Sequence, residues 1–369
     1  MSLKLTTFKH TKNWFIRGTI EGRRILESTG TTNKKQAEEY RRKREAELWQ
    51  ERIYGAREVV NFEAAALAYI KDQQRSPATL RYLDKLVMYF GAWKLKDINN
   101  AALRGAYSNI LQKGEEASPA TKKRAIRTPL QAVLEHAAIL GWCDRPAFAP
   151  ISVQKKPKKF LMPDEATLLI EHAADHLKPL LVFLLCTGCR ASEAFDLKWA
   201  DVDLRGKRAT VWQKQGRQRF IDLCPTALHW LQDIEWRDGY VFRPVRLTKG
   251  APIIGERYHD AGRQYGGQMK RGWAGACRRA GFAGRIREWT PKGSKKVSSI
   301  FVPELTPHCL RHTWASWHYC VHKDILRLQS DGDWSDIGVV TEYAKLMPDA
   351  YKDDIIRWWS HGPNIAKIP

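Results

Sequence analysis

The sequence predicts a mainly α-helical protein with small β-sheets, organised as three successive parts. Apolar residues recur at helical spacing over most of the chain after Asn61, and two Ser-Pro pairs mark helix starts in that stretch. The alternating pattern of β-strands is confined to short segments near the N-terminus and in the second half. The length of 369 residues fits two or three domains, since a domain has about 150 residues.

The first part, residues 1–57, is predicted to be a basic β-hairpin followed by a helix. Two segments with strand character, 14–20 and 23–29, flank the turn sequence Glu21-Gly22, and Asn33 can cap the helix that follows. This part carries 14 Lys and Arg against 7 Glu. Such a face is either an ordinary solvated surface or an electrostatic site for a polyanion.

The second part, residues 58–153, is predicted to be a four-helix domain. At Ser76-Pro77 and Ser118-Pro119 the serine can cap the free N–H groups of a helix, and the proline occupies the first turn, where its missing N–H costs nothing. Pro129 should bend or interrupt a later helix. The expected buried faces are Leu80, Leu83, Val87 and Phe90 on one helix and Leu130, Val133, Leu134 and Ala137 on another.

The third part, residues 160–369, follows a linker at 154–159 whose sequence QKKPKK is polar, basic and interrupted by proline. Helices are expected near 164–175 and 178–186, then a strand pair at 208–213 and 218–223, an extra β-hairpin within 282–303, and further helices to the C-terminus.

Charge and composition narrow the functional classes. Basic residues number 62 and acidic residues 40, which leaves a formal net charge of +22 and favours a polyanionic partner. No apolar run approaches the roughly 20 residues that span a bilayer, and the N-terminus lacks the apolar core of a signal peptide, so we expect an intracellular protein. Seven scattered cysteines suit reduced thiols, and the single CxxC at Cys186 and Cys189 lacks a second ligand pair for a metal.

Three separated segments carry residues suited to phosphodiester chemistry. TGCRASEAFDLKWADVDL at 187–204 places Arg190 at the start of a helix, where anions are favoured. TPHCLRHTWASWHY at 306–319 puts His308 and Arg311 on one helix face. DWSDIGVVTEYAKL at 333–346 contains a tyrosine, Tyr343. Each segment alone is better explained as an ordinary surface helix, so the prediction depends on the three together.

Taken together, the three segments resemble the tyrosine recombinase (phage integrase) family, whose signature is Arg, then His-x-x-Arg, then His or Trp, then Tyr. The resemblance covers roughly residues 60–350 and implies two domains that clamp duplex DNA. Carried over by position, it implies catalytic roles for Arg190, Lys214, His308, Arg311, Trp334 and Tyr343, and a supporting role for Glu193. The family usually has an apolar-Gly-His run before the tyrosine segment, and here the run is Ser-Asp-Gly-Asp-Trp.

This assignment implies a reaction that needs neither metal nor ATP. Two arginines would hold the scissile phosphate, and Tyr343 would attack phosphorus to give a phosphotyrosine that conserves the bond energy. His308 would move the tyrosine proton, Lys214 would protonate the leaving 5′ oxygen, and Trp334 would donate to the phosphate. His312 and the nearby Trp314 and Trp317 are interpreted as structural, and no cofactor is expected.

The resemblance also implies the partners. They are double-stranded DNA attachment sites, a homotetramer on synapsed DNA, a DNA-bending host factor and a directionality factor, in the nucleoid of a bacterial host, without a membrane. In the family the small N-terminal domain reads arm-type sites, and the C-terminal tail, here containing Ile355, Ile356, Trp358 and Trp359, commonly docks on a neighbouring protomer. The expected DNA contacts are Arg17, Arg23, Arg24, Lys155, Lys156, Lys158, Lys159, Arg217 and Arg219.

Two alternatives remain open at this point. A type IB topoisomerase shares the phosphotyrosine chemistry but relaxes supercoils, and the small N-terminal module favours the integrase over it. A non-catalytic DNA-binding protein could keep the same fold, but the full set of catalytic residues, Tyr343 included, argues against it. A two-site recombination assay would distinguish an integrase from a topoisomerase. An assay for a covalent protein–DNA complex would distinguish an integrase from a non-catalytic DNA-binding protein.

Overall fold

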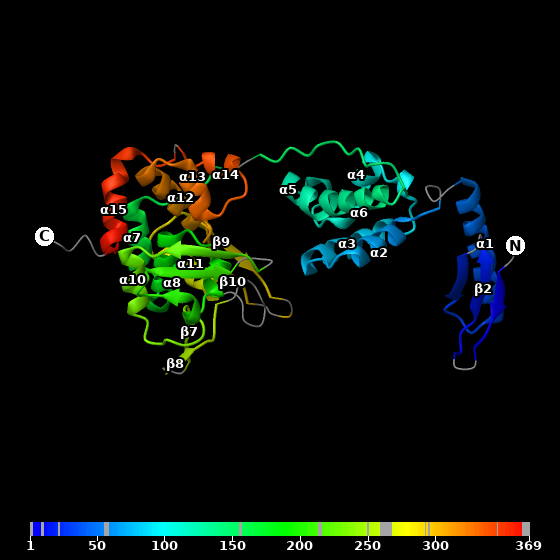
Figure 1. The fold of residues 1–369 in the computed structure, drawn as a ribbon, viewed down its shortest axis with the longest axis horizontal. Helices are drawn as coiled ribbons and strands as arrows, with labels where there is room; N and C mark the ends of the chain where they lie inside the picture. Colours follow the sequence, from blue (N-terminus) through cyan, green and yellow to red (C-terminus); the bar gives the residue numbers. More distant parts are fainter. Residues whose placement is uncertain are drawn as a thin grey trace. The chain divides into compact units, whose positions relative to one another are not determined.

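The computed structural model divides the chain into two compact units, Met1–Lys155 and Lys156–Pro369. The residues it describes are 3–8, 11–20, 23–54, 59–154, 157–212, 216–248, 251–258, 268–291, 293, 296–344 and 346–363. The protein is mainly helical, and the β-sheets of the described residues are small and antiparallel (Figure 1). None of the helices in these residues is long and apolar enough to cross a membrane.

The N-terminal hairpin is confirmed and has a third strand. Strands β2 (Phe15–Ile20) and β3 (Arg23–Ser28) pair antiparallel, and β1 (Lys4–Thr6) adds to the other edge of β2. Helix α1 (Lys34–Tyr54) follows, capped by the Asn33 side chain, which accepts from the Lys35 N–H at 2.9 Å. The core of this part is small, with Leu3, Ile16 and Ile25 buried together.

The next part is all helical, as predicted, and has its own hydrophobic core. Its helices are α2 (Phe62–Asp72), α3 (Pro77–Phe90), α4 (Asn100–Ile110), α5 (Pro119–Lys122) and α6 (Thr128–Ile139), with short turns at Leu95–Asp97 and Gly114–Glu116. Ser76 and Ser118 cap α3 and α5 by accepting N–H bonds at 3.2 and 3.3 Å. Both Ser-Pro predictions are therefore confirmed.

One detail of this part differs from expectation, and a second takes an unexpected form. Leu80 was predicted to be buried but is 39% exposed, because the buried stripe of α3 runs through Leu83, Leu86 and Phe90 instead. The interruption expected at Pro129 takes the form of a π-helical turn at Lys123–Arg127, which ends two residues before the proline. This turn interrupts the α-helical hydrogen bonding while the chain stays helical from α5 into α6, and it accommodates a residue that cannot donate an N–H to the preceding turn.

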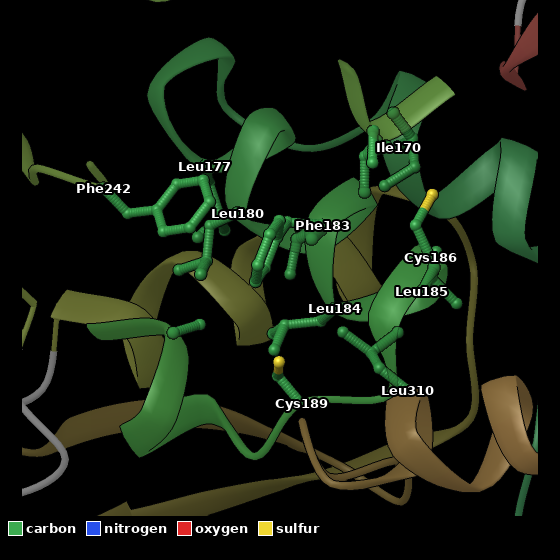
Figure 2. Packing of buried hydrophobic residues seen from close by; sticks show 14 of the residues in the cluster. Ile170, Leu177, Leu180, Phe183, Leu184, Leu185, Cys186, Cys189, Phe242 and Leu310 are labelled. Atoms are coloured by element: carbon green, nitrogen blue, oxygen red, sulfur yellow. The ribbon is translucent and has the colours of Figure 1, made fainter. Parts of the chain in front are cut away.

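The second unit is built around a helix that is buried along nearly its whole length. All residues of α8 (Lys178–Thr187) from Leu180 onward are buried, which explains its unbroken apolar sequence. Figure 2 shows that Phe242 and Leu310, from distant parts of the chain, join the side chains of α8 in one cluster. This rigid centre carries the loop that leads to Arg190.

The other elements of this unit surround α8. The helices are α7 (Pro163–Glu171), α9 (Ala191–Phe195), α10 (Pro225–Gln232), α11 (Gln268–Arg279), α12 (Cys309–His322), α13 (Ile325–Gly332), α14 (Ile337–Thr341) and α15 (Lys352–His361). One sheet has the order β4 (Val202–Asp203), β5 (Arg208–Trp212), β6 (Gln218–Asp222). Two hairpins, β7 (Val245–Thr248) with β8 (Ala251–Ile254) and β9 (Gly284–Trp289) with β10 (Ser298–Pro303), complete the unit; the second was predicted.

The C-terminal helix α15 packs on its own unit. Ile355 and Trp358 are buried, the Trp358 indole donates to the Thr167 hydroxyl at 3.2 Å, and its carbonyl accepts from Thr226 at 2.8 Å. In this single chain the two side chains pack within their own unit, and docking of the tail on a neighbouring protomer stays a prediction. Most of the apolar surface of the tail is therefore buried in the core of its own unit. Of the four apolar residues predicted for docking, Ile356 is the one that is substantially exposed, at 40%.

Candidate active site

Arg190 lies at the N-terminal end of α9, where the chain turns away from α8. Gly188 ends α8 in the left-handed region with φ of 62°, and Arg190 then precedes the first turn of α9. Glu193 accepts from the Arg190 backbone N–H at 3.0 Å and from its Nη1 at 2.6 Å. The Arg190 side chain is 43% exposed. The carboxylate thus fixes the guanidinium while leaving part of it open to an anion.

Arg311 is buried and joins all three predicted segments. Its Nη1 donates to the Gly188 carbonyl and its Nη2 to the Gly332 carbonyl, both at 2.6 Å. Its guanidinium also lies 4.2 Å from the centre of the Trp334 ring. Burial, reinforced by the charges of Arg219 and Arg190, lowers the pKa of Arg311 to about 10, so it remains protonated at neutral pH.

The two glycines that receive Arg311 are required by close packing. A Cβ on Gly188 would lie 2.1 Å from the Trp314 ring, and one on Gly332 would lie 1.7 Å from the Trp334 ring. Neither tryptophan ring has a flexible end that could move aside. The indoles therefore pack directly on the backbone whose carbonyls hold Arg311.

Glu193 has a second, buried cationic partner. Arg219 on β6 lies 3.5 Å from the Glu193 carboxylate, with side-chain exposures of 5% and 6%. Arg219 also donates to the Asp331 carbonyl at 2.7 Å and to the Cys189 sulfur at 3.2 Å. The predicted DNA contact of Arg219 does not fit the structure, because its side chain is buried and paired with Glu193. By contrast, Arg217 is exposed and pairs with Asp333 at 3.2 Å.

Tyr343 follows α14 and points into the same region. Its hydroxyl lies 2.7 Å from Nδ1 of His312, and its ring is 5.7 Å from that of Trp334. The residue is 2% exposed. Burial raises the pKa of Tyr343 to about 12, against the opposing charge of Arg311, so the hydroxyl keeps its proton at neutral pH.

The two histidines of α12 stand side by side. His308 and His312 have ring centroids 4.7 Å apart, as their four-residue spacing on one helix requires. Desolvation, then the charges of Arg311, Arg190 and Lys158, lowers the pKa of His308. Desolvation, then His308, Lys158 and Arg311, lowers the pKa of His312 to about 4. A neutral His312 can accept the Tyr343 hydroxyl proton at Nδ1.

His312 is the functional candidate that the sequence interpretation missed. It was read as structural because the family signature contains only His308 and Arg311 in this motif. The signal that could have found it is its spacing, since a histidine four residues after His308 shares its helix face.

A cleft of about 350 Å³ opens beside Arg190 and His308. Its lining includes Ser192 at the first turn of α9 and Lys270 of α11. A cleft with arginine, lysine and histidine on its walls suits a phosphodiester group. Within the described residues, no three His, Cys, Asp or Glu side chains gather as a metal site.

The remaining predicted residues are the catalytic Lys214 and the expected DNA contacts, and the structure describes only some of them. Lys214, Lys155 and Lys156 lie outside the described residues, and the side chain of Arg23 is not described either. Arg17 and Arg24 are exposed on the N-terminal hairpin. Lys159 is exposed and pairs with Glu304. Lys158, also expected on DNA, packs against Tyr343 with 17% side-chain exposure.

The fold and the site together define a tyrosine site-specific DNA recombinase. Comparison with known proteins agrees. The "Phage integrase family" matches residues 159–349 and the "Phage integrase N-terminal domain" matches residues 7–52. Since the first match spans more than half of the sequence, the chain belongs to the phage integrase family.

Individual proteins give the same picture. The integrase of Salmonella phage P22 is 26% identical over 94% of this chain and 92% of its own. The Tn1549 transposon integrase in complex with transposon right end DNA superposes with a TM-score of 0.52, at 15% identity over 81% of this chain and 99% of that one. A lambda integrase dimer bound to a core site superposes with a TM-score of 0.51, at 14% identity over 76% of this chain and 92% of that one. The two structures support the fold.

Proposed function

We propose that this recombinase cuts and rejoins duplex DNA attachment sites through a 3′-phosphotyrosyl intermediate on Tyr343. The observation that carries the proposal is the Tyr343 hydroxyl, held 2.7 Å from His312 in the site that contains Arg311. The Tyr343 hydroxyl is a nucleophile already hydrogen-bonded to a proton acceptor, His312, whose pKa of about 4 keeps it neutral at pH 7.

In the proposed step, the Tyr343 oxygen forms a bond to phosphorus while the bond from phosphorus to the 5′ oxygen breaks. The tyrosine proton passes to His312, which is hydrogen-bonded to the Tyr343 hydroxyl, in place of His308, to which the family resemblance assigned this transfer. The departing 5′ oxygen takes a proton from Lys214, the role implied by the family resemblance. Religation reverses both transfers. The exchange conserves the phosphodiester bond energy, so ATP is not required.

Arg190 and Arg311 would neutralise the charge that develops on the non-bridging oxygens. A guanidinium carries more N–H groups than the two that Arg311 uses on glycine carbonyls, so it can still donate to phosphate. Arg190 would approach from the cleft that it lines with His308. The Trp334 indole, fixed against Arg311, would donate to the same phosphate and pack on Tyr343.

The proposal extends to partners. We propose that four copies assemble on two synapsed sites, that residues 1–57 read separate arm-type sites, and that a DNA-bending host factor and a directionality factor set the outcome. The exposed Arg17 and Arg24, on the neighbouring strands β2 and β3 of the three-stranded sheet, support DNA binding by the N-terminal part. The sites themselves are those of a phage or prophage in a bacterial host.

The test is covalent trapping on a nicked suicide substrate. Tyr343→Phe removes only the attacking oxygen, so DNA binding should survive while the covalent adduct disappears. Tyr351→Phe, a nearby tyrosine outside the site, is the control and should retain cleavage. An adduct that persists in Tyr343→Phe would exclude this nucleophile, and relaxation of supercoils without strand exchange between two sites would favour a topoisomerase.

A further inference from the structure

Lys158 belongs to the linker that precedes α7, yet its side chain lies on the segment that carries Tyr343. Its Nζ is 3.8 Å from the centre of the Tyr343 ring, 2.9 Å from the Glu342 carboxylate and 3.1 Å from the Val339 carbonyl. All three contacts are with the end of α14 and the turn after it. The Lys158 side chain therefore makes three contacts with residues 339–343, the segment that carries the proposed nucleophile.

The neighbouring lysine shows that this placement is specific. Lys159 pairs with Glu304 instead, and its side chain is 49% exposed, compared with 17% for Lys158. A basic linker serving only as a phosphate contact would leave both ammonium groups in solvent. Here one of the two is withdrawn onto an aromatic face and a carboxylate.

Lys158 and His312 hold Tyr343 from different sides. The hydroxyl is fixed by His312 at 2.7 Å, and the ring is covered by the Lys158 ammonium. Lys158 also contributes to lowering the pKa of both His308 and His312, which keeps the proton acceptor neutral. One linker side chain thus helps to orient the ring and, after burial as the main cause, helps to keep its histidine partner neutral.

We propose that Lys158 is a positioning residue that holds Tyr343 ready for attack, so that the interdomain linker acts on the reaction through this lysine. The inference rests on the proposed role of Tyr343 as nucleophile. A displacement of a reacting group by about 1 Å can cost about a hundredfold in rate, so three contacts on its segment are enough to matter.

The first measurement needs neither DNA nor cleavage. Hydrogen exchange of residues 337–344 is compared in the full-length protein, in Lys158→Met and in Lys159→Met, which removes the same charge from the next position. Exchange should accelerate only in Lys158→Met, because only that substitution frees the segment. Equal exchange in the two variants would overturn the proposal.

The second measurement is single-turnover cleavage of a suicide substrate at saturating protein. We expect Lys158→Met to cleave at least about tenfold more slowly than Lys159→Met while the two bind DNA equally, and Lys158→Arg to restore part of the rate. Cleavage equal to or faster than Lys159→Met would overturn the proposal. So would a slower rate explained entirely by weaker binding, because that indicates a phosphate contact alone.

A pH profile separates positioning from a general loss of structure. The groups that face His312 are His308, Lys158, Arg311, Glu342 and Tyr343. Removing the Lys158 charge leaves Glu342 beside the ring, which raises the pKa of His312, so the acid limb of cleavage should move to higher pH only in Lys158→Met. An unmoved limb would argue against the proposal. If the wild-type protein forms no adduct at Tyr343, the proposed function fails, while hydrogen exchange still tests the Lys158 contact.

Discussion

Arg217 and Arg219 lie two residues apart, and replacing each with methionine tests the buried network behind Arg190. Arg219→Met removes a charged hydrogen bond to the Asp331 carbonyl and the ion pair with Glu193. Breaking a buried pair costs about 3–5 kcal/mol. The lower value applies here, because Glu193 keeps its 2.6 Å bond to Arg190. A unit of this size then loses about 6–12 °C in melting temperature, at about 2–4 °C per kcal/mol.

Arg217→Met should cost less than about 1 kcal/mol, because its pair with Asp333 is solvent-exposed. Differential scanning calorimetry of the full-length protein follows the unit that contains both residues. A melting temperature in Arg219→Met no lower than in Arg217→Met would refute the reasoning. If Arg219 instead contacts phosphate, its loss would lower DNA affinity and reduce the salt dependence of binding by about one ion, with stability unchanged.

Three further predictions follow from the site. The pKa values of His312 and His318 are each lowered from the ordinary 6.5 to about 4 in the folded protein. Below pH 6.5 the unfolded chain therefore binds more protons than the folded chain. The free energy of unfolding should therefore fall by about 2 kcal/mol per histidine from pH 7.5 to pH 5 in urea titrations, and His318→Gln should abolish its share. Cleavage should continue in excess EDTA, since Arg190 and Arg311 supply the charge, and restoration by Mg²⁺ after inhibition would contradict this. Deleting residues 1–57 removes a net charge of +7; core-site cleavage should remain, while footprints on a second class of sites should vanish.

The sequence predicted the elements whose causes are local. A serine or asparagine side chain before a helix can accept one of its free N–H groups, so the caps at Asn33, Ser76 and Ser118 could be predicted directly from the sequence. The order of Arg190, Arg311 and Tyr343 was also visible, because the chemistry fixes residue types. Their mutual distances were not, since these depend on how α8, α12 and α14 pack.

The misassigned arginine shows why local patterns fail at such a site. On β6 the apolar Phe220 is 61% exposed while the charged Arg219 is 6% exposed, on the same buried face as Ile221, so burial and polarity are reversed at these two positions. The reversal is stable only because Glu193, from α9, meets Arg219 inside. A strand pattern contains no information about that partner, and the hydropathy of β6 therefore points the wrong way. Lys158 is a similar case, because its partner at Val339 lies 181 residues further along the chain.

Backbone carbonyls, rather than acidic side chains, hold the most buried cation of the site. Arg311 donates to the Gly188 and Gly332 carbonyls, and in the described part of the chain no carboxylate accepts a hydrogen bond from it. A carboxylate bonded directly to Arg311 would cancel charge that a phosphate needs, whereas a carbonyl orients the guanidinium and leaves its net charge intact. Glu193 instead forms ion pairs with both Arg190 and Arg219. Because this one carboxylate faces two guanidinium groups, the cluster keeps a net positive charge. Any residue would offer a neutral backbone carbonyl, so the glycines at 188 and 332 follow from the close packing of Trp314 and Trp334 on their backbone. Electrostatics explains why the acceptors of Arg311 are carbonyls, since a carbonyl leaves the positive charge available for DNA.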